Sequence, residues 1–227
     1  GGTMHIADMS LGILGANGIV AGGMGMATGA GLSAKMRGTQ QVAVCFFGDG
    51  AMNQGAFLES ANIASIWDLP VLFVCENNHY GEYTSAKAIT AVKEHLAERA
   101  AGFDMPAMVV DGNDTVAVYE TAKKMVDRAR SGEGPSFIEN KTYRYHGHHV
   151  GDGDPEKTYR TQEETDMWKA KDPIPRFSRR MLKAGMVSEE ELEKIDEQIK
   201  QQVQDAVEFA KQSPYPAADE VTDHVYV

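Results

Sequence analysis

The sequence predicts an α/β protein with a doubly wound parallel sheet and a helical extension at its carboxyl end. Four short apolar runs, typical of buried strands, begin near residues 42, 71, 107 and 136 and alternate with stretches of helical periodicity. Turn residues follow these runs, and parallel sheets gather such turns at one edge, where α/β proteins bind ligands. A chain of 227 residues can bury the core of one such domain with appendages.

A glycine-rich helix is expected before the first strand. From Gly18 to Gly38 small and apolar residues follow helical spacing, and Lys35 lies near the end, where a cation is favoured. Each glycine inside a helix costs about 1 kcal/mol relative to alanine. The glycines between Gly22 and Gly31 therefore predict close packing on a strand or on another subunit.

The central motif consists of a strand, a turn, a helix and a second strand with its own turn. The apolar run Val42 to Phe47 ends in Gly48-Asp49-Gly50, and helical spacing follows from Asn53 to Trp67. The second run, Val71 to Val74, leads to Asn77-Asn78. Both turns fall at the carboxyl ends of neighbouring parallel strands, so Asp49 and Asn78 are expected to meet over one ligand.

The chemistry of these two side chains favours a magnesium site. A carboxylate and an amide oxygen are too few for a complete calcium cage, but they suit a magnesium ion that keeps positions for phosphate oxygens and water. The glycines beside Asp49 let backbone approach closely. Gly-Asp-Gly alone is also an ordinary turn, and Glu59 on the following helix is more often a surface group than a catalytic acid. No GxGxxG follows a strand and no GK[ST] loop is present, which disfavours dinucleotide and nucleoside triphosphate sites.

The next segments complete the predicted sheet. Residues Ala91 to Gly102 are expected to form a short helix, and Ala107 to Val110 a strand that leads into an Asp-Gly-Asn-Asp turn. Asp114 is well placed to cap the helix that follows. Pro135 to Tyr143 forms the fourth predicted strand.

A polar loop rich in histidine follows the fourth strand, from Tyr143 to Pro155. Three histidines beside two aspartates could indicate zinc, but they lack the helical or paired-cysteine spacing of convincing zinc sites. A solvated loop and an active-site loop that carries imidazoles are the other interpretations. We expect one α/β domain over residues 1–150. Residues 151–227 are expected to form this loop and a helical extension, with a capping box at Ser188, that pack on the same domain.

Composition limits the partners and the compartment. The chain has 33 acidic and 22 basic residues, a formal charge of −11, which argues against nucleic acid and anionic membrane surfaces. No apolar run approaches the roughly 18 to 20 residues of a membrane helix. Cys45 and Cys75 lie in apolar strands, where buried reduced cysteines are usual, so we expect a cytoplasmic protein. Gly1 in place of a methionine suggests that a segment precedes it.

Several segments resemble a known family. Gly-Asp-Gly, a helix and Asn-Asn at the end of a strand resemble the diphosphate and magnesium motif of thiamine diphosphate enzymes. The whole chain resembles the alpha subunit of the first component of 2-oxo acid dehydrogenase complexes, of the acetoin and pyruvate dehydrogenase type. The segments that carry this resemblance are MHIAD at Met4–Asp8, LGANGIV at Leu14–Val20, FFGDGAMNQGAF at Phe46–Phe57, PVLFVCENNHYG at Pro70–Gly81 and YRYHGH at Tyr143–His148.

The resemblance implies the diphosphate-binding type of the thiamine diphosphate fold and a set of site residues. Magnesium would be held by Asp49, Asn78 and the carbonyl of Tyr80. His148 would be the catalytic histidine, with His146 and Arg144 beside it. The cofactor-binding residues implied in this way are Gly18, Val20, Gly48, Asp49, Gly50, Ala51, Asn78, Tyr80 and His148.

The resemblance also implies partners. No acidic residue of this chain is convincingly arranged to activate the cofactor, and in the family a glutamate of a beta subunit does so within an α2β2 assembly. The substrate would be acetoin or a 2-oxo acid such as pyruvate, and the acceptor a lipoyl-bearing dihydrolipoyl acyltransferase. In mitochondrial pyruvate enzymes a phosphorylated serine follows the histidine, whereas His149 follows it here. The alternatives are half of a transketolase-like thiamine enzyme and a noncatalytic scaffold subunit.

Overall fold

The computed structural model describes residues 3–92 and 94–223. The chain divides into two compact units, Gly1–Arg176 and Phe177–Val227. The polar loop after the fourth strand and the residues that follow it up to Arg176 therefore lie in the same unit as the sheet.

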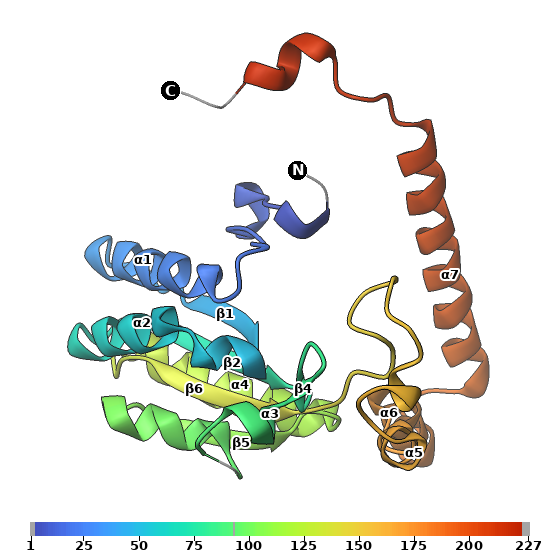
Figure 1. Cartoon of the computed structure of the whole chain (residues 1–227), viewed down its shortest axis with the longest axis horizontal. Helices are drawn as coiled ribbons and strands as arrows, with labels where there is room; N and C mark the ends of the chain where they lie inside the picture. The colour runs from blue at the N-terminus through green and yellow to red at the C-terminus, as the bar shows by residue number, and fades with distance from the viewer. Residues whose placement is uncertain (1–2, 93, 224–227) are drawn as a thin grey trace. The chain divides into compact units, whose positions relative to one another are not determined.

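Four parallel strands form the centre of the first unit (Figure 1). They are β1 (Ala43–Gly48), β2 (Val71–Asn77), β5 (Ala107–Asp111) and β6 (Ser136–Lys141). Their order across the sheet is β1-β2-β6-β5, and each adjacent pair is parallel. The predicted α/β class and parallel sheet are confirmed.

Helices cover both faces of this sheet. On one face α1 (Gly22–Met36), α2 (Gly55–Ile66) and the 3-10 helix η4 (Leu96–Phe103) share a core with the strands. Phe57 of α2 is fully buried there and packs edge-on against Phe73 and Phe137, with ring centroids 6.2 and 5.9 Å apart. On the other face α4 (Thr115–Arg130) packs on apolar side chains of β2, β5 and β6.

The glycines of α1 differ in how closely they approach their neighbours. A Cβ atom on Gly31 would lie 2.5 Å from Cγ2 of Val71, at the start of β2, whereas one on Gly25 or Gly29 would meet nothing within 4 Å. The expectation of close packing against a strand is confirmed at Gly31, whereas a Cβ atom on Gly23 would lie at an ordinary contact distance, 3.7 Å, from Sγ of Cys45 in β1. The helix begins four residues later than expected, because Ala21 before it has a left-handed backbone with φ 66°.

The region between β2 and β5 differs from the prediction. The expected helix over 91–102 is a 3-10 helix that begins at Leu96, because His95 before it is extended, and Asp104 ends it in a left-handed conformation. Residue 93 of the expected helix lies outside the described residues. A short hairpin and a short helix, which the sequence did not indicate, precede it: β3 (Tyr80–Gly81), β4 (Thr84–Ser85) and α3 (Ala86–Ile89).

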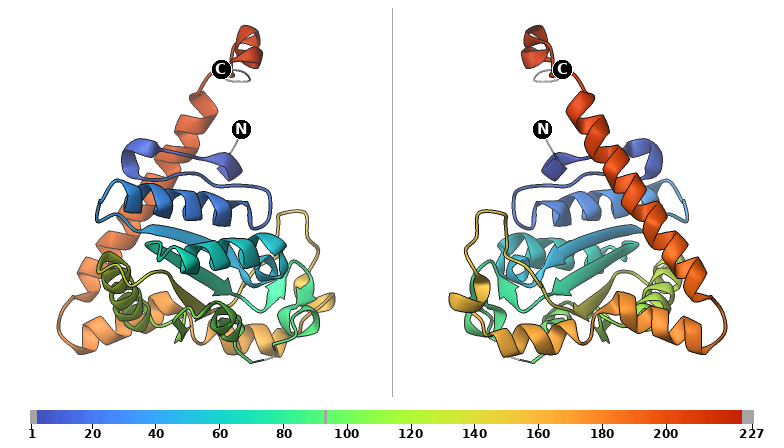
Figure 2. Two further views of the ribbon diagram at one scale, coloured as in Figure 1. Left: turned by 90° about the vertical axis from the view of Figure 1, so that its left-hand side faces the viewer. Right: turned by 90° about the vertical axis from the view of Figure 1, so that its right-hand side faces the viewer.

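The predicted helix caps are confirmed. The Asp114 side chain accepts from the backbone N–H groups of Val116 and Ala117 at the start of α4. Ser188 and Glu191 form a capping box at the start of α7, a single continuous helix (Figure 2). The remaining helices are η1 (Thr3–His5), η2 (Met9–Leu11), η3 (Asp49–Asn53), η5 (Pro155–Lys157), α5 (Gln162–Lys169), α6 (Pro173–Lys183), α7 (Glu189–Gln212) and η6 (Ala218–Thr222).

Both cysteines are free and buried, as predicted. Among residues 3–92 and 94–223, no helix has both the length and the apolar character that a membrane crossing requires.

The packing of Gly31 gives a stability test. Gly31→Ala should lower the free energy of unfolding by about 1 to 3 kcal/mol, because the new methyl group has to displace a buried valine. Gly29→Ala in the same helix is the control and should raise it by about 1 kcal/mol, because alanine favours the helix and meets no neighbour. Urea unfolding midpoints measure both changes. Equal effects of the two substitutions would contradict this account of the helix.

Candidate active site at the carboxyl edge of the sheet

The pairing of β1 with β2 brings the two predicted turns together. Gly48 at the end of β1 lies opposite Glu76 of β2, so the turns that follow both strands begin at nearly the same level of the sheet. A Cβ atom on Gly50 would lie 3.3 Å from the Cα of Gly81, which shows how closely the two segments approach. The Gly-Asp-Gly turn therefore lies directly against the segment that follows Asn78.

Asp49 is buried at this junction without enough partners. Asp49 is only 1% exposed, and its Oδ2 atom has no hydrogen-bond partner. Burial raises the pKa of Asp49; the N–H groups of Asp49 and Asn78 and the charge of Arg144 act in the opposite direction, and Glu139 raises the pKa further. A buried carboxylate oxygen with no donor is unfavourable, and a bound cation would remove the penalty.

The two asparagines have different roles. Asn77 donates to Oε1 of Glu139 at 2.7 Å and accepts from the N–H of His79 at 3.1 Å, so both ends of its amide are used. Asn78 accepts through Oδ1 from the N–H of Tyr80 at 3.0 Å. An amide oxygen has two lone pairs, so Asn78 keeps acceptor capacity for a cation.

Glu139 is a structural carboxylate that was not predicted from the sequence. It is fully buried in β6, and its second oxygen accepts from the N–H of Ala97 at 2.9 Å. Glu139 thereby joins β2, through Asn77, to η4. A lone glutamate inside an apolar strand is the signal that could have singled it out.

Tyr80 links this junction to α5. The residue is 8% exposed, and its hydroxyl donates to Glu164 at 3.0 Å. Burial and this hydrogen bond raise the pKa of Tyr80, so the hydroxyl stays protonated. Tyr80 also packs edge-on against the ring of Tyr159, with centroids 5.2 Å apart.

His148 lies exposed in the loop after β6, beside Arg144. Its Nδ1 atom is 3.1 Å from Nη1 of Arg144. A guanidinium only donates, so Nδ1 accepts, and the proton of the neutral ring is on Nε2. Arg144 also donates to the carbonyl of Glu82 and to the hydroxyl of Tyr159, the latter at 3.1 Å. The structure thus brings together two of the three predicted catalytic residues, Arg144 and His148.

Arg160 holds the backbone of this loop. Its side chain is fully buried, and it donates to the carbonyl oxygens of Arg144, of Tyr145 at 2.9 Å and of His146 at 3.5 Å. An ion pair with Glu156 at 2.9 Å balances its charge. His146 is exposed, and its carbonyl oxygen is one of the acceptors through which Arg160 holds the loop. No local pattern in the sequence marks Arg160 for this role.

Asp152 closes the other side of the loop. It accepts from the backbone N–H groups of His148 and His149, the latter at 3.2 Å, and it pairs with the His149 ring at 2.9 Å. A hydrogen bond from Tyr83 is the main cause that lowers the pKa of Asp152.

Within the described parts of the chain, no group of three or more His, Cys, Asp or Glu side chains is arranged to hold a metal, so the structure gives no support to a zinc site.

The other predicted residues lie around this centre or apart from it. Gly48 ends β1, and Gly50 and Ala51 lie in η3, next to Asp49. Gly18 and Val20 lie exposed in the segment before α1, and among the hydrogen bonds of the described residues none links them to Asp49. Glu59 is exposed on α2, which agrees with the interpretation that it is a surface group.

Comparison with known proteins agrees with the resemblance noted in the sequence. Residues 1–219 match the family of the dehydrogenase E1 component. The alpha subunits of acetoin:2,6-dichlorophenolindophenol oxidoreductase from Bacillus subtilis and Cupriavidus necator are 46% and 47% identical, over all of this chain and 67% of each relative. The alpha subunit of the pyruvate dehydrogenase E1 component from Zymomonas mobilis is 41% identical, over all of this chain and 63% of that protein. The chain belongs to the dehydrogenase E1 component family.

Proposed function

We propose that this chain is the alpha subunit of a thiamine diphosphate-dependent dehydrogenase that cleaves acetoin or decarboxylates a 2-oxo acid such as pyruvate. The acyl unit is passed to a lipoyl domain. The observation that carries the proposal is the buried, unpartnered oxygen of Asp49 where the turns after β1 and β2 meet. The names of the relatives, acetoin oxidoreductase and pyruvate dehydrogenase subunits, support the two substrate classes.

The residues at the junction suit magnesium and a diphosphate. Asp49 offers a carboxylate oxygen and Asn78 an amide oxygen with a spare lone pair. With the carbonyl of Tyr80 they would supply the hard oxygen ligands that magnesium prefers, with diphosphate oxygens and water as its further ligands. The charge of the cation offsets the burial of Asp49 near Glu139.

The backbone around the junction is suited to a close ligand. Gly50 lies against Gly81 with no side chain between the two segments. We assign Gly48, Gly50 and Ala51 to the diphosphate, and Gly18 and Val20 to the cofactor on the basis of the family resemblance. When bound, thiamine diphosphate supplies the electron sink for breaking a carbon–carbon bond beside a carbonyl group.

His148 acts in the transfer to the lipoyl group. In that step the sulfur–sulfur bond of the dithiolane breaks, one sulfur takes the acyl group and the other takes a proton, while the acyl donor is oxidised. Arg144 contacts Nδ1 of His148 and so orients the ring, and the imidazolium form of His148 supplies that proton and becomes the neutral imidazole. Arg160 and Asp152 fix the backbone on both sides of the ring.

The proposal includes a second subunit. Glu139 is already bonded to Asn77 and Ala97, and Asp49 is assigned to the metal. We therefore assign the carboxylate that activates the cofactor to a beta subunit, in an α2β2 assembly that serves a lipoyl-bearing dihydrolipoyl acyltransferase.

Asp49→Asn tests the metal site through stability. The folded-state pKa of Asp49 is raised, so its contribution to stability is complete below about pH 4 and is lost as the pH rises through that raised pKa. In metal-free protein the variant should unfold at a higher temperature than the wild type at about pH 8, and the two should converge at about pH 4. Thermal unfolding in chelator measures this difference.

Magnesium with thiamine diphosphate should then stabilise the wild type and have little effect on Asp49→Asn. Asp104→Asn is the matched control, because this aspartate is exposed and its left-handed φ of 52° also suits asparagine. Equal stabilisation of the wild type and Asp49→Asn by magnesium and cofactor would reject Asp49 as a ligand.

Assembly tests the function itself. The isolated chain should show little turnover of acetoin or pyruvate, and addition of the matching beta subunit should restore it, because the activating carboxylate is supplied there. Calorimetry should show binding of thiamine diphosphate that requires magnesium. Full turnover by the isolated chain would refute the shared site, and an assembly that binds no cofactor would indicate a noncatalytic scaffold.

His148→Ala tests the transfer step. Acylation of a lipoyl domain should fall by roughly two to four orders of magnitude, the usual effect of a lost acid or base. Reduction of the artificial acceptor 2,6-dichlorophenolindophenol should fall less, because that dye takes electrons without lipoyl protonation. Cofactor affinity from calorimetry should change little. Equal loss in both assays would show that His148 shapes the loop instead of acting in transfer.

A further inference from the structure

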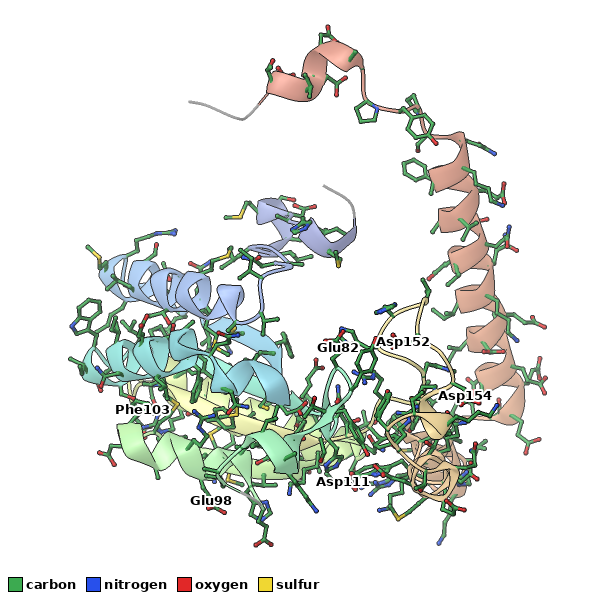
Figure 3. All side chains as sticks on the ribbon, in the orientation of Figure 1. Glu82, Glu98, Phe103, Asp111, Asp152 and Asp154 are labelled. Carbon is green, nitrogen blue, oxygen red and sulfur yellow. The ribbon has the colours of Figure 1, made fainter. Side chains whose placement is uncertain are left out.

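The tip of the β3–β4 hairpin has no role in the mechanism above, yet it touches the loop that carries His148. Glu82 and Tyr83 lie between Tyr80–Gly81 and Thr84–Ser85, and Glu82 has a left-handed backbone with φ 56°. Figure 3 shows Glu82 of this tip beside Asp152 of the loop. The same short hairpin begins with Tyr80, which is assigned to the metal site.

The first contact runs through Asp152. The hydroxyl of Tyr83 donates to Oδ1 of Asp152 at 2.5 Å. The other oxygen, Oδ2, accepts from the backbone N–H groups of His148 and His149. The Asp152 side chain is only 3% exposed and both of its oxygens accept hydrogen bonds, so the carboxylate has little freedom to turn. Two successive hydrogen bonds therefore join Tyr83 to the backbone of His148.

The second contact runs through Arg144. The carbonyl of Glu82 accepts from this guanidinium, which also holds Nδ1 of His148. The hairpin tip thus supports both the backbone and the ring of the same histidine. Asp152 raises the pKa of Tyr83 to about 12, so the hydroxyl remains a donor throughout the working range of an enzyme.

We propose that Tyr83 is a positioning residue for His148, which it orients through Asp152, and that the hairpin thereby joins the metal site to the transfer loop. The catalytic part of this inference rests on the proposed function. Amide exchange reports on the contact separately from catalysis.

Tyr83→Phe removes the hydroxyl and keeps the ring, which packs on Tyr159 with centroids 5.6 Å apart. In the enzyme assembled with its beta subunit, the amide N–H groups of His148 and His149 should exchange with solvent about three- to tenfold faster, the factor expected for one lost hydrogen bond. The turnover number for lipoyl acylation should fall by a similar factor, with the KM for the lipoyl domain nearly unchanged. Tyr119→Phe, on the exposed face of α4, is the matched control and should change neither quantity.

A double-mutant cycle identifies the route. If Tyr83 acts through Asp152, Tyr83→Phe should have little further effect on turnover in an Asp152→Ala background, where this hydrogen-bond partner is absent. Additive effects would show that Tyr83 does not act through this carboxylate and would overturn the proposal. Unchanged amide exchange in Tyr83→Phe, or faster exchange with unchanged turnover, would overturn it as well. Failure of the proposed function looks different, because the wild-type assembly would then neither bind thiamine diphosphate nor acylate a lipoyl domain.

Discussion

The parallel register of β1 and β2 is the constraint on which the candidate active site depends. Because Gly48 lies opposite Glu76, the chain leaves both strands at one level and the backbones of Gly50 and Gly81 can meet. A shift of the register by one residue would turn the alternate side chains of a strand to the other face of the sheet. It would also separate Asp49 from Asn78. The apolar cores on both faces therefore fix the position of the polar site as well as the stability of the sheet.

The loop that carries His148 is held by a different kind of interaction. It has no apolar period that could bury it, so its order depends on hydrogen bonds to its backbone. Arg160 supplies these from one side through three carbonyl oxygens, and Asp152 supplies them from the other through two N–H groups. Arg160 can remain buried because Glu156 balances its charge and the rings of Tyr143 and Tyr159 lie over its guanidinium.

Local signals in the sequence predict the sheet and the ends of its elements. Apolar runs mark the strands, and the caps at Asp114 and Ser188 depend on residues within three positions, which a single sequence displays directly. The supports of the site are distant in the chain. The hydrogen bond between Asn77 and Glu139 joins residues 62 positions apart, and the one between Tyr83 and Asp152 joins residues 69 positions apart. The sequence around one residue of such a pair does not indicate the other. The proximity of the turns after β1 and β2 was predictable, because it follows from the topology of the parallel sheet and does not depend on any individual side-chain contact.

The long helix α7 has a consequence for hydrogen exchange. None of its 24 residues is buried, although Ile195, Ile199 and Val203 follow an apolar stripe and are each more than half exposed. Its order within the chain comes from its capping box and from pairs one turn apart, such as Lys200 with Asp196, which contribute only tenths of a kcal/mol each. The free energy of local opening in α7 is then much smaller than that of the strands beneath α2. Its amides act as a built-in reporter: they stay labile while the stripe faces water and become protected when another surface covers it.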